Sequence, residues 1–315
     1  MLSVIIPVYN EADALTENLA AIRASFDRQR LSYTLHVVDD GSSDGTWDLL
    51  LSISKTEPRV RGVRLSRNFG KEAAISAGLR AAAGGSLFLV MDSDLQHPPD
   101  AVSDMLRLME ETGADIVNGV KRHRGDESAG RRASAGGFYR LFRWASGVDL
   151  NRSSDFKLLS ARVVDSLSQF QEGRLFFRGL VSYVGFKTVE YEFEVRPRHA
   201  GNSRFSTRKL VRMAIDTALS YTAKPIYFTL IVGAVFFVLA VVLGIQTLVN
   251  FFTGRAVSGF TTVILLLLIL GSALTLSLGV IGAYIARIYD EVKGRPPYII
   301  SDRTDGENTS EGAND

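Results

Sequence analysis

Two long segments without charged side chains constrain this chain more than any other feature of its sequence. They comprise residues 226–252 and 260–286, and Arg255, in the loop between them, is the only Asp, Glu, Lys, Arg or His from residue 226 to residue 286. At ~1.5 Å per residue, each segment is long enough to cross a ~30 Å hydrocarbon core. A buried pair of soluble helices is the alternative, but interior helices of this length rarely lack charges. We therefore expect a transmembrane hairpin of two helices over residues 226–287.

The positive charges around this hairpin predict its orientation. The loop carries only Arg255, whereas the outer flanks carry Lys224, Arg287 and further basic residues beyond them. Because Lys and Arg accumulate on the cytoplasmic side of membrane proteins, the N-terminal part of the chain and its C-terminus are both expected in the cytoplasm. The absence of cysteine agrees with a reducing compartment without proving one.

The regions beside the hairpin have their own patterns. Residues 204–225 place apolar side chains at helical spacing among basic ones, which predicts a juxtamembrane amphipathic helix. Residues 175–186 are also apolar, with Arg174 and Arg178 beside them, and form either a core helix or a helix against lipid headgroups. Residues 288–315 are expected to be a cytoplasmic tail, whose polar and acidic part from Asp302 onward should be disordered.

Charge and the N-terminus exclude two further possibilities. The formal net charge is only +2, and no run of like charges resembles a polyanion-binding stripe, so nucleic acid is not an expected partner. The first seven residues are apolar and are followed at once by Asn10 and Glu11, without a basic leader or a small-residue cleavage site. They predict a β-strand and not a signal peptide.

Strand-like and helix-like patterns alternate through the N-terminal part, which we expect to be a catalytic domain over residues 1–203. This alternation predicts an α/β domain with a mostly parallel sheet, in which ligands bind beyond the carboxyl ends of the strands. The expected strands cover residues 2–7, 34–38, 60–65 and 86–91, and the expected helices cover residues 12–26, 46–55 and 71–83.

Acidic residues follow two of these strands. Asp39 and Asp40 end the second strand, and the next turn contains glycines. Helix capping explains part of this loop, and hydrogen bonding to ribose hydroxyls or base edges is the functional alternative.

Asp92 and Asp94 follow the strand at residues 86–91, and side chains two apart in an extended segment point the same way. Their carboxylates can converge on Mg²⁺ or Mn²⁺, which bind oxygen ligands and neutralise a diphosphate.

Two other nucleotide-binding patterns are missing from the sequence. No Gly-x-Gly-x-x-Gly follows the first strand, which argues against a dinucleotide-dependent dehydrogenase. Around Gly70 and Lys71, Leu65 and Glu72 stand where a phosphate-binding loop requires a glycine and a Ser or Thr. A kinase-type ATP site is therefore unsupported.

Six motifs make the sequence resemble the family 2 glycosyltransferases, and among them the polyprenyl-phosphate glycosyltransferases, which include bactoprenol glucosyltransferases and dolichol-phosphate mannose synthase. The resemblance extends from the N-terminus to about Asp302. The motifs are Pro-Val-Tyr-Asn-Glu at 7–11, Val-Asp-Asp-Gly-Ser-Ser-Asp-Gly-Thr at 38–46, Leu-Ser-Arg-Asn-Phe-Gly-Lys-Glu at 65–72, Met-Asp-Ser-Asp-Leu-Gln-His-Pro-Pro at 91–99, Ser-Asp-Phe-Lys-Leu-Leu at 154–159 and Arg-His-Ala-Gly-Asn-Ser-Arg-Phe at 198–205.

The resemblance implies a GT-A fold and the inverting transfer of one sugar from a nucleotide-diphosphate donor to a lipid phosphate. It implies Asp155 and Asp94 as catalytic residues, with Asp92 and Asp94 as ligands of Mg²⁺ or Mn²⁺. The residues implied to bind the nucleotide sugar are Pro7, Tyr9, Glu11, Asp39, Asp40, Lys71, Asp92 and Gln96. Those implied to bind the acceptor and phosphates are Lys121, Arg122, Arg131, Arg198, Ser203 and Arg204.

Asp155 matches the acid often assigned as the catalytic base of the family. A phosphate monoester has a second pKa of ~6, so it is mostly a dianion at neutral pH and can attack without losing a proton. We therefore interpret Asp155 as a residue that orients the acceptor or a donor hydroxyl, and helix capping is the alternative.

The donor, the assembly and two rival functions complete the hypotheses. UDP-glucose with undecaprenyl phosphate, in a bacterial inner membrane, is the first choice, and GDP-mannose, a UDP-N-acetylhexosamine or a UDP-aminoarabinose derivative are alternatives. A homotetramer is implied by the resemblance alone.

A processive polysaccharide synthase would carry more spans and a Gln-x-x-Arg-Trp segment after Asp155, but the only Arg-Trp pair, Arg143-Trp144, precedes it. A non-catalytic scaffold would have damaged metal ligands, which the sequence does not show.

Overall fold

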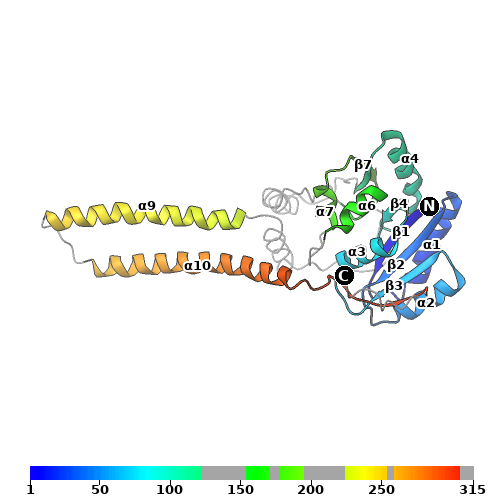
Figure 1. Ribbon diagram of the computed structural model, residues 1–315, viewed down its shortest axis with the longest axis horizontal. Helices are drawn as coiled ribbons and strands as arrows, with labels where there is room; N and C mark the ends of the chain where they lie inside the picture. The colour runs from blue at the N-terminus through cyan, green and yellow to red at the C-terminus, as the bar shows by residue number, and fades with distance from the viewer. Residues whose placement is uncertain (122–153, 171–176, 195–223, 254–258, 306–315) are drawn as a thin grey trace. The chain divides into compact units, whose positions relative to one another are not determined.

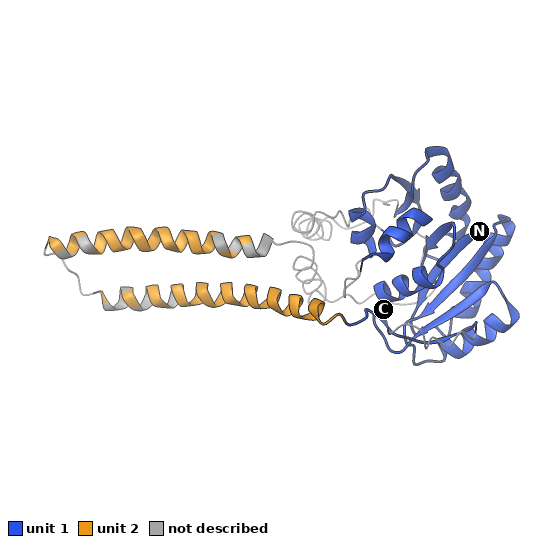
Figure 2. Cartoon of the chain, in the orientation of Figure 1, with its two compact units in different colours: residues 1–139, 148–203, 295–315 blue, residues 140–147, 204–294 orange. Residues whose placement is uncertain are grey.

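The computed structural model of the protein (Figure 1) describes residues 1–121, 154–170, 177–194, 224–253 and 259–305. The chain divides into two units, shown in different colours in Figure 2. Of the described residues, unit 1 contains 1–121, 154–170, 177–194 and 295–305, and unit 2 contains 224–253 and 259–294. The chain therefore leaves unit 1 for the two long helices and returns to it near the C-terminus.

Unit 1 is built on an eight-stranded mixed sheet with the order β7-β5-β6-β4-β1-β2-β3-β8. The central strands β3, β2, β1 and β4 are parallel, β5 and β7 are parallel to each other, and β6 and β8 run antiparallel to their neighbours. The strands are β1 (Leu2–Val8), β2 (Tyr33–Asp39), β3 (Val60–Leu65), β4 (Leu87–Val90), β5 (Ile116–Lys121), β6 (Lys157–Ser160), β7 (Thr188–Phe193) and β8 (Ile300–Arg303). The prediction of an α/β domain with a mostly parallel sheet is confirmed.

Helices cover both faces of this sheet (Figure 1). The apolar side chains of β1 explain the arrangement, because alternate residues enter different core clusters: Val4 and Ile6 pack with the cluster that contains α1, α2 and α4, whereas Ile5 packs with the cluster that contains α3, α6 and α7. Both faces of β1 and β2 are buried, as expected for central parallel strands. The helices are α1 (Leu15–Arg28), α2 (Thr46–Thr56), α3 (Lys71–Ala81), α4 (Val102–Thr112), α6 (Ala161–Ser168) and α7 (Phe177–Tyr183), with a 3₁₀ turn at Pro99–Ala101.

The direction of β6 positions the residues of the site. In the parallel part of the sheet, the carboxyl ends of β1, β2 and β4 meet at one edge. Because β6 runs the other way, it starts at that same edge, where Lys157 is paired with both Val90 of β4 and Asn118 of β5. The residues just before β6 therefore lie beside the loop that follows β4. This crossover brings Asp155 next to Asp92 although the two are far apart in the sequence.

The C-terminal part of the chain differs from expectation. Asp302 and Arg303 belong to β8, which pairs antiparallel with β3, and the Thr304 hydroxyl accepts a 2.8 Å hydrogen bond from the amide of Gly62. Tyr298 and Ile300 pack against a buried cluster that contains Val63. The prediction of disorder from Asp302 onward is therefore wrong for residues 302–305, because edge pairing and apolar side chains hold them, and residues 306–315 lie outside the described part of the chain.

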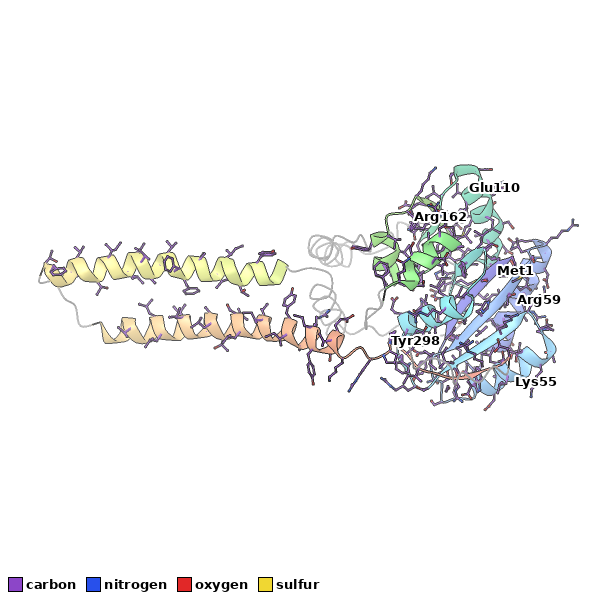
Figure 3. All side chains as sticks on the ribbon, in the orientation of Figure 1. Met1, Lys55, Arg59, Glu110, Arg162 and Tyr298 are labelled. Carbon is purple, nitrogen blue, oxygen red and sulfur yellow. The ribbon has the colours of Figure 1, made fainter. Side chains whose placement is uncertain are left out.

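Unit 2, where it is described, consists of α9 (Lys224–Phe252) and α10 (Phe260–Val292), of 29 and 33 residues. Among the residues searched, one stretch, Ile269–Val292, is long and apolar enough to cross a membrane, and Ile231–Thr247 is a shorter apolar stretch. Many of their apolar side chains, such as Phe237 and Leu278, are exposed, and the described side chains project outward from both helices in Figure 3. Exposed apolar surface of this extent marks contact with a membrane or a protein. The second membrane span is not confirmed and stays a prediction.

Candidate active site

The loop after β4 presents the acid pair Asp92 and Asp94. The backbone amide of Asp92 donates a 3.0 Å hydrogen bond to Nδ1 of His97, and the amide of Gln96 donates one of 3.1 Å to Oδ1 of Asp94. Between them Leu95 has a positive φ of 58°, a conformation that non-glycine residues adopt only when surrounding contacts hold it. These bonds turn the chain back on itself directly after the strand, so the two acids lie at the edge of the sheet.

His97 supports this loop from the core. Its ring is buried and stacks on Phe156, with 5.1 Å between ring centroids, and burial lowers its pKa. Because Nδ1 accepts the Asp92 amide, the neutral ring carries its proton on Nε2. His97 therefore has a structural position, because its Nδ1 is occupied by the Asp92 amide and its ring packs on Phe156.

A chain of opposite charges connects three elements at the same edge. Lys71, the first residue of α3, lies with Nζ 2.5 Å from Oδ1 of Asp92 and 2.7 Å from Oδ2 of Asp155. Arg178 of α7 binds both oxygens of Asp155, with Nε 2.6 Å from Oδ1 and Nη2 2.9 Å from Oδ2. Two-point binding of a carboxylate by a guanidinium is among the strongest polar contacts in proteins. The structure thus brings together Lys71, Asp92 and Asp155, three of the residues expected at the site.

The charge state of this cluster follows from its contacts. Asp155 is only 5% exposed, and although burial acts to raise its pKa, the hydrogen bonds from Arg178 and the charge of Lys71 hold that pKa well below its usual range. Burial likewise opposes the charge on Lys71, but the carboxylates of Asp92 and Asp155 raise its pKa. Asp155 is therefore an anion and Lys71 a cation at any physiological pH.

The loop after β1 is attached to both neighbouring loops. The amide of Glu11 donates a 3.0 Å hydrogen bond to the hydroxyl of Thr46, and the hydroxyl of Ser93 donates one to Oε2 of Glu11. Burial raises the pKa of Glu11, and the Ser93 hydrogen bond opposes this shift. Nearby, Pro7 lies within β1 and Tyr9 is 46% exposed. Glu11 thus connects the start of α2 to the loop that carries the acid pair.

Asp39 and Asp40 are adjacent but have different surroundings. Both oxygens of Asp40 accept backbone amides, from Phe69 at 2.7 Å and from Gly70 at 2.9 Å, so this carboxylate holds the loop that leads into α3. Asp39 is fully buried and accepts the amide of Ser42 at 2.9 Å through Oδ1. Its Oδ2 accepts no hydrogen bond within the described part of the chain, but it lies 3.6 Å from Nε of Arg64, with which it forms an ion pair. A buried carboxylate oxygen without a hydrogen bond is costly, and the nearby guanidinium offsets part of that cost.

The acid pair has the chemistry of a divalent metal site. Mg²⁺ and Mn²⁺ are bound through oxygen, and Mg²⁺ commonly uses one or two protein carboxylates with substrate phosphates and water completing its shell. Asp92 and Asp94 supply two carboxylates on one loop, and the described residues contain no group of three or more His, Cys, Asp or Glu side chains that would form a complete protein cage. The residues therefore fit an ion whose remaining ligands come from a bound diphosphate.

Several expected residues lie elsewhere or outside the described residues. Lys121 is the last residue of β5 and is exposed. The core-helix alternative holds for the described part of residues 175–186, because Phe177, Leu180 and Val181 of α7 are buried. The predicted acceptor residues Arg122, Arg131, Arg198, Ser203 and Arg204, and the amphipathic helix at 204–225 up to residue 223, fall outside the described part of the chain.

Arg178, Ser93 and Glu72 are not among the residues that the sequence predicts for the site. Arg178 was placed beside a possible headgroup contact, yet it binds Asp155. The available sequence signal is that Arg178 lies within an apolar stretch, because a charged residue buried with such neighbours needs an internal partner. No pattern in the sequence shows that Ser93 bonds to Glu11, because that contact depends on two loops meeting at the sheet edge.

Comparison with known proteins decides the family. The sequence model of Glycosyl transferase family 2 matches residues 3–168, which include β1 to β6 and the acid pair.

The chain belongs to glycosyl transferase family 2. It is therefore a glycosyltransferase, and its α/β unit with a mixed, mostly parallel sheet is a GT-A fold, as the resemblance implied. An uncharacterized glycosyltransferase, YkcC of Bacillus subtilis, is 34% identical over 95% of this chain and 92% of its own length. The bactoprenol glucosyl transferase of Shigella phage SfII is 32% identical over 95% of this chain and 97% of its own.

Solved structures resemble the chain more distantly. The mannosyltransferase PcManGT from Pyrobaculum calidifontis, in complex with GDP-Man and Mn²⁺, has a TM-score of 0.49 at 19% identity and covers 70% of this chain and 63% of its own. Glucosyl-3-phosphoglycerate synthase from Mycobacterium tuberculosis, in complex with Mn²⁺, UDP and glucosyl-3-phosphoglycerate, has a TM-score of 0.49 at 20% identity and covers 70% of this chain and 79% of its own.

Proposed function

We propose that this glycosyltransferase moves a single glucose from UDP-glucose to undecaprenyl phosphate at the cytoplasmic face of a bacterial inner membrane. The observation that carries the proposal is the similarity to bactoprenol glucosyl transferases over 95% of the chain, which includes both the acid site and the apolar helices. A relative that shared only the catalytic unit would support a nucleotide-sugar enzyme and would leave the lipid acceptor without support.

The nucleoside is proposed to bind between the loops after β1 and β2. Oδ2 of buried Asp39, which faces Arg64 at 3.6 Å but accepts no hydrogen bond from the described residues, is an acceptor for a base or ribose donor. Exposed Tyr9 offers an aromatic face to a base. Pro7 and Glu11 shape the same loop. Asp40 acts indirectly in this proposal, because both of its oxygens already hold the amides of Phe69 and Gly70.

The donor diphosphate is proposed to lie over the loop after β4. Asp92 and Asp94 would hold Mg²⁺ or Mn²⁺, and Gln96 lies on the same turn. When bound, the ion would supply positive charge to the leaving nucleoside diphosphate. Lys71 supplies a further fixed positive charge, because its Nζ already lies 2.5 Å from Asp92. Such preorganised charge lowers the barrier by stabilising the developing anion.

Asp155 is proposed to position Lys71 and the reacting groups instead of removing a proton. Its low pKa, which Arg178 and Lys71 maintain against the effect of burial, makes it a weak base. The acceptor phosphate needs no base, since with a second pKa of ~6 it is mostly a dianion at neutral pH. Catalysis then comes from in-line placement of the phosphate oxygen and the anomeric carbon, and from charge on the leaving group.

The acceptor is proposed to approach along the basic residues before the membrane helices. These are Lys121, Arg122, Arg131, Arg198 and Arg204, together with the polar Ser203. Of them, Lys121 lies at the carboxyl end of β5, the sheet edge where Asp155 precedes β6. Two spans, with both termini in the cytoplasm, would hold unit 1 at the surface where an undecaprenyl phosphate headgroup lies. A homotetramer is part of the proposal by resemblance only.

A substrate panel tests this function. The purified full chain, in liposomes with undecaprenyl phosphate and Mn²⁺, is offered radiolabelled UDP-glucose, GDP-mannose, UDP-N-acetylglucosamine or a UDP-aminoarabinose derivative, and the labelled lipid is identified by chromatography. We expect one labelled glucosyl lipid with UDP-glucose, sensitive to mild acid as a phosphodiester-linked sugar. If another donor labels the lipid and UDP-glucose does not, glucose is the wrong sugar. A ladder of longer products would indicate a polysaccharide synthase. No labelled lipid with any donor would refute the proposal.

A further inference from the structure

Arg178 completes the surroundings of Asp155 from a helix that carries none of the residues expected at the site. Its guanidinium occupies both oxygens of Asp155, at 2.6 Å and 2.9 Å, and Lys71 shares Oδ2 at 2.7 Å. We propose that Arg178 is a positioning residue that orients Asp155 and, through it, sets how Lys71 is shared between Asp155 and Asp92. This inference rests on the proposed function, because it concerns how the same site stabilises the leaving diphosphate.

Helix α7 is held in place at the position that this role requires. It has only seven residues, and its buried side chains Phe177, Leu180 and Val181 pack into the core cluster or beside it. The amide of Phe177, at the start of the helix, donates a 2.7 Å hydrogen bond to Oε2 of Glu72. A carboxylate at a helix N-terminus satisfies a free amide and interacts favourably with the helix dipole. Glu72 thus fixes the turn from which Arg178 projects.

These contacts form a closed ring between two helices. On α3 the neighbours Lys71 and Glu72 contact Asp155 and the Phe177 amide, and on α7 the neighbours Phe177 and Arg178 contact Glu72 and Asp155. Because each helix contributes two adjacent residues, a shift of either helix would break two contacts at once. The ring therefore defines the orientation of the Asp155 carboxylate more narrowly than Lys71 alone would.

The charge balance explains why an arginine is needed. Without Arg178, a buried carboxylate would keep only Lys71 as a cation, and burial of a carboxylate with incomplete pairing is strongly unfavourable. Lys71 would then be drawn toward Asp155 and away from Asp92, where its charge supports the diphosphate. Lysine in place of Arg178 keeps the charge but loses the planar fork that binds both oxygens.

A double-mutant cycle on the full chain tests this role. The variants are R178Q, R178K, D155N and R178Q/D155N, and the control is R162Q, which removes an arginine from α6 whose side chain is 75% exposed (Figure 3). Three quantities are measured: kcat and donor KM for lipid glucosylation, the dissociation constant of Mn²⁺ alone by electron paramagnetic resonance, and Tm.

We expect R178Q to lower kcat by about 100-fold, the effect of a small misplacement of reacting groups, with little change in donor KM and with R178K intermediate. In the D155N background R178Q should have no further effect on kcat. Without Arg178, Lys71 moves away from Asp92, which leaves that carboxylate free to bind Mn²⁺. The substitution R178Q should therefore tighten Mn²⁺ binding more when Asp155 is present than in the D155N background. R162Q should match wild type.

Equal, additive losses of kcat in the two backgrounds, or an R178Q enzyme as active as wild type, would overturn the proposal. If R178Q shows no cooperative thermal unfolding, and so is not folded, the cycle is run with R178K. The Mn²⁺ arm needs neither donor nor acceptor, so the role of Arg178 fails if Mn²⁺ binding shows no coupling between Arg178 and Asp155, whatever the lipid assay gives. A wild-type enzyme that labels no lipid but shows this coupling would refute only the proposed function.

Discussion

Asp155 accepts hydrogen bonds from Arg178 and Lys71, and these two cations decide what its carboxylate can do. Burial alone would favour the neutral acid, but the paired cations favour the anion and hold the pKa of Asp155 well below its usual range. A carboxylate in this state is a poor proton acceptor and a good anchor for a lysine. Its pKa is depressed, so the stability it contributes is present above the ordinary aspartate pKa and is lost only at acid pH.

The first prediction concerns the variant D155N. It should lose kcat by about 100-fold because Lys71 and Arg178 lose their shared partner. The shape of its pH-rate profile between about pH 5 and 9 should match that of wild type, since Asp155 does not titrate there. Steady-state assays across this range provide the measurement. Loss of an acidic limb in D155N would show that Asp155 is a base after all.

A second prediction follows from Glu72, whose pKa burial raises to about 7 from an ordinary value of 4.5, with a further contribution from Asp155. Glu72 therefore ionises near pH 4.5 in the unfolded chain and near pH 7 in the folded chain. Because the unfolded chain releases its proton first, the free energy of unfolding falls as pH rises from 4.5 to about 7. E72Q removes this ionisation and keeps an acceptor for the Phe177 amide. The Tm of E72Q minus the Tm of wild type should therefore be a few degrees larger at pH 8 than at pH 5, since each kcal/mol of stability changes Tm by about 2–4 °C. The same difference at both pH values would contradict this.

The third prediction concerns the acid pair. Chelation of divalent ions should abolish transfer, and added Mn²⁺ or Mg²⁺ should restore it, because in the proposed mechanism Asp92 and Asp94 hold the ion that neutralises the diphosphate. D92A and D94A should lose at least about 100-fold in kcat and should not be rescued by excess metal. D104N on α4, which alters an exposed acid, is the control. Full activity after chelation, or in a D92A/D94A enzyme, would remove the basis of the mechanism.

At the scale of elements, β8 is the part of the chain whose position local patterns did not reveal. It adds an edge strand to β3, and the amide of Ser66 donates to the carbonyl of Ile299 at 2.9 Å. The chain that follows α10 thereby stabilises the strand leading to Arg67, beside the Asp40 loop. Gly62 permits this approach, because a Cβ there would lie 2.6 Å from the Thr304 methyl group.

The fourth prediction tests this edge with T304V. Valine keeps the shape of the side chain but cannot accept the 2.8 Å hydrogen bond from the amide of Gly62, which would be left buried. The expected cost is about 1–3 kcal/mol, seen as faster hydrogen exchange of the β3 amides in the full chain. T56V is the matched control, since the Thr56 hydroxyl is exposed and bonds only within α2. Equal exchange in T304V and wild type would mean that β8 contributes little.

At the scale of the whole molecule, a soluble-type α/β unit and an apolar helix pair are joined in one chain. The surfaces of the two units differ: the apolar side chains of unit 1 form buried clusters, whereas Phe237 and Leu278 of unit 2 are largely exposed apolar groups. Apolar residues of this kind are stable only against lipid or protein. The proposed hairpin satisfies them with lipid, and the positive flanks set its direction.

The fifth prediction tests this topology and uses the absence of cysteine. A membrane-impermeant maleimide should label T253C, at the end of α9, in intact spheroplasts, but should label K55C of α2 (Figure 3) only after permeabilisation. The reason is that T253C lies between the two proposed spans and K55C lies in the cytoplasmic unit. Labelling of T253C only after permeabilisation would rule out a two-span hairpin.

The amino-acid sequence by itself determined the α/β class, because strand and helix periodicity are local properties of the chain. With the rule for parallel strands it also predicted the sheet edge and the acid pair of the proposed site. The hypothesis that Asp155 orients a substrate group came from the family resemblance and the chemistry of a phosphate acceptor, and it stays a prediction. Only the tertiary structure decided that Arg178 binds Asp155, that Asp40 holds a backbone loop while Asp39 pairs with Arg64, and that the chain after α10 returns as β8. Each of these contacts joins residues from separate elements. Their meeting depends on the antiparallel insertion of β6, the packing of α7 and the pairing of an edge strand, which no local pattern encodes.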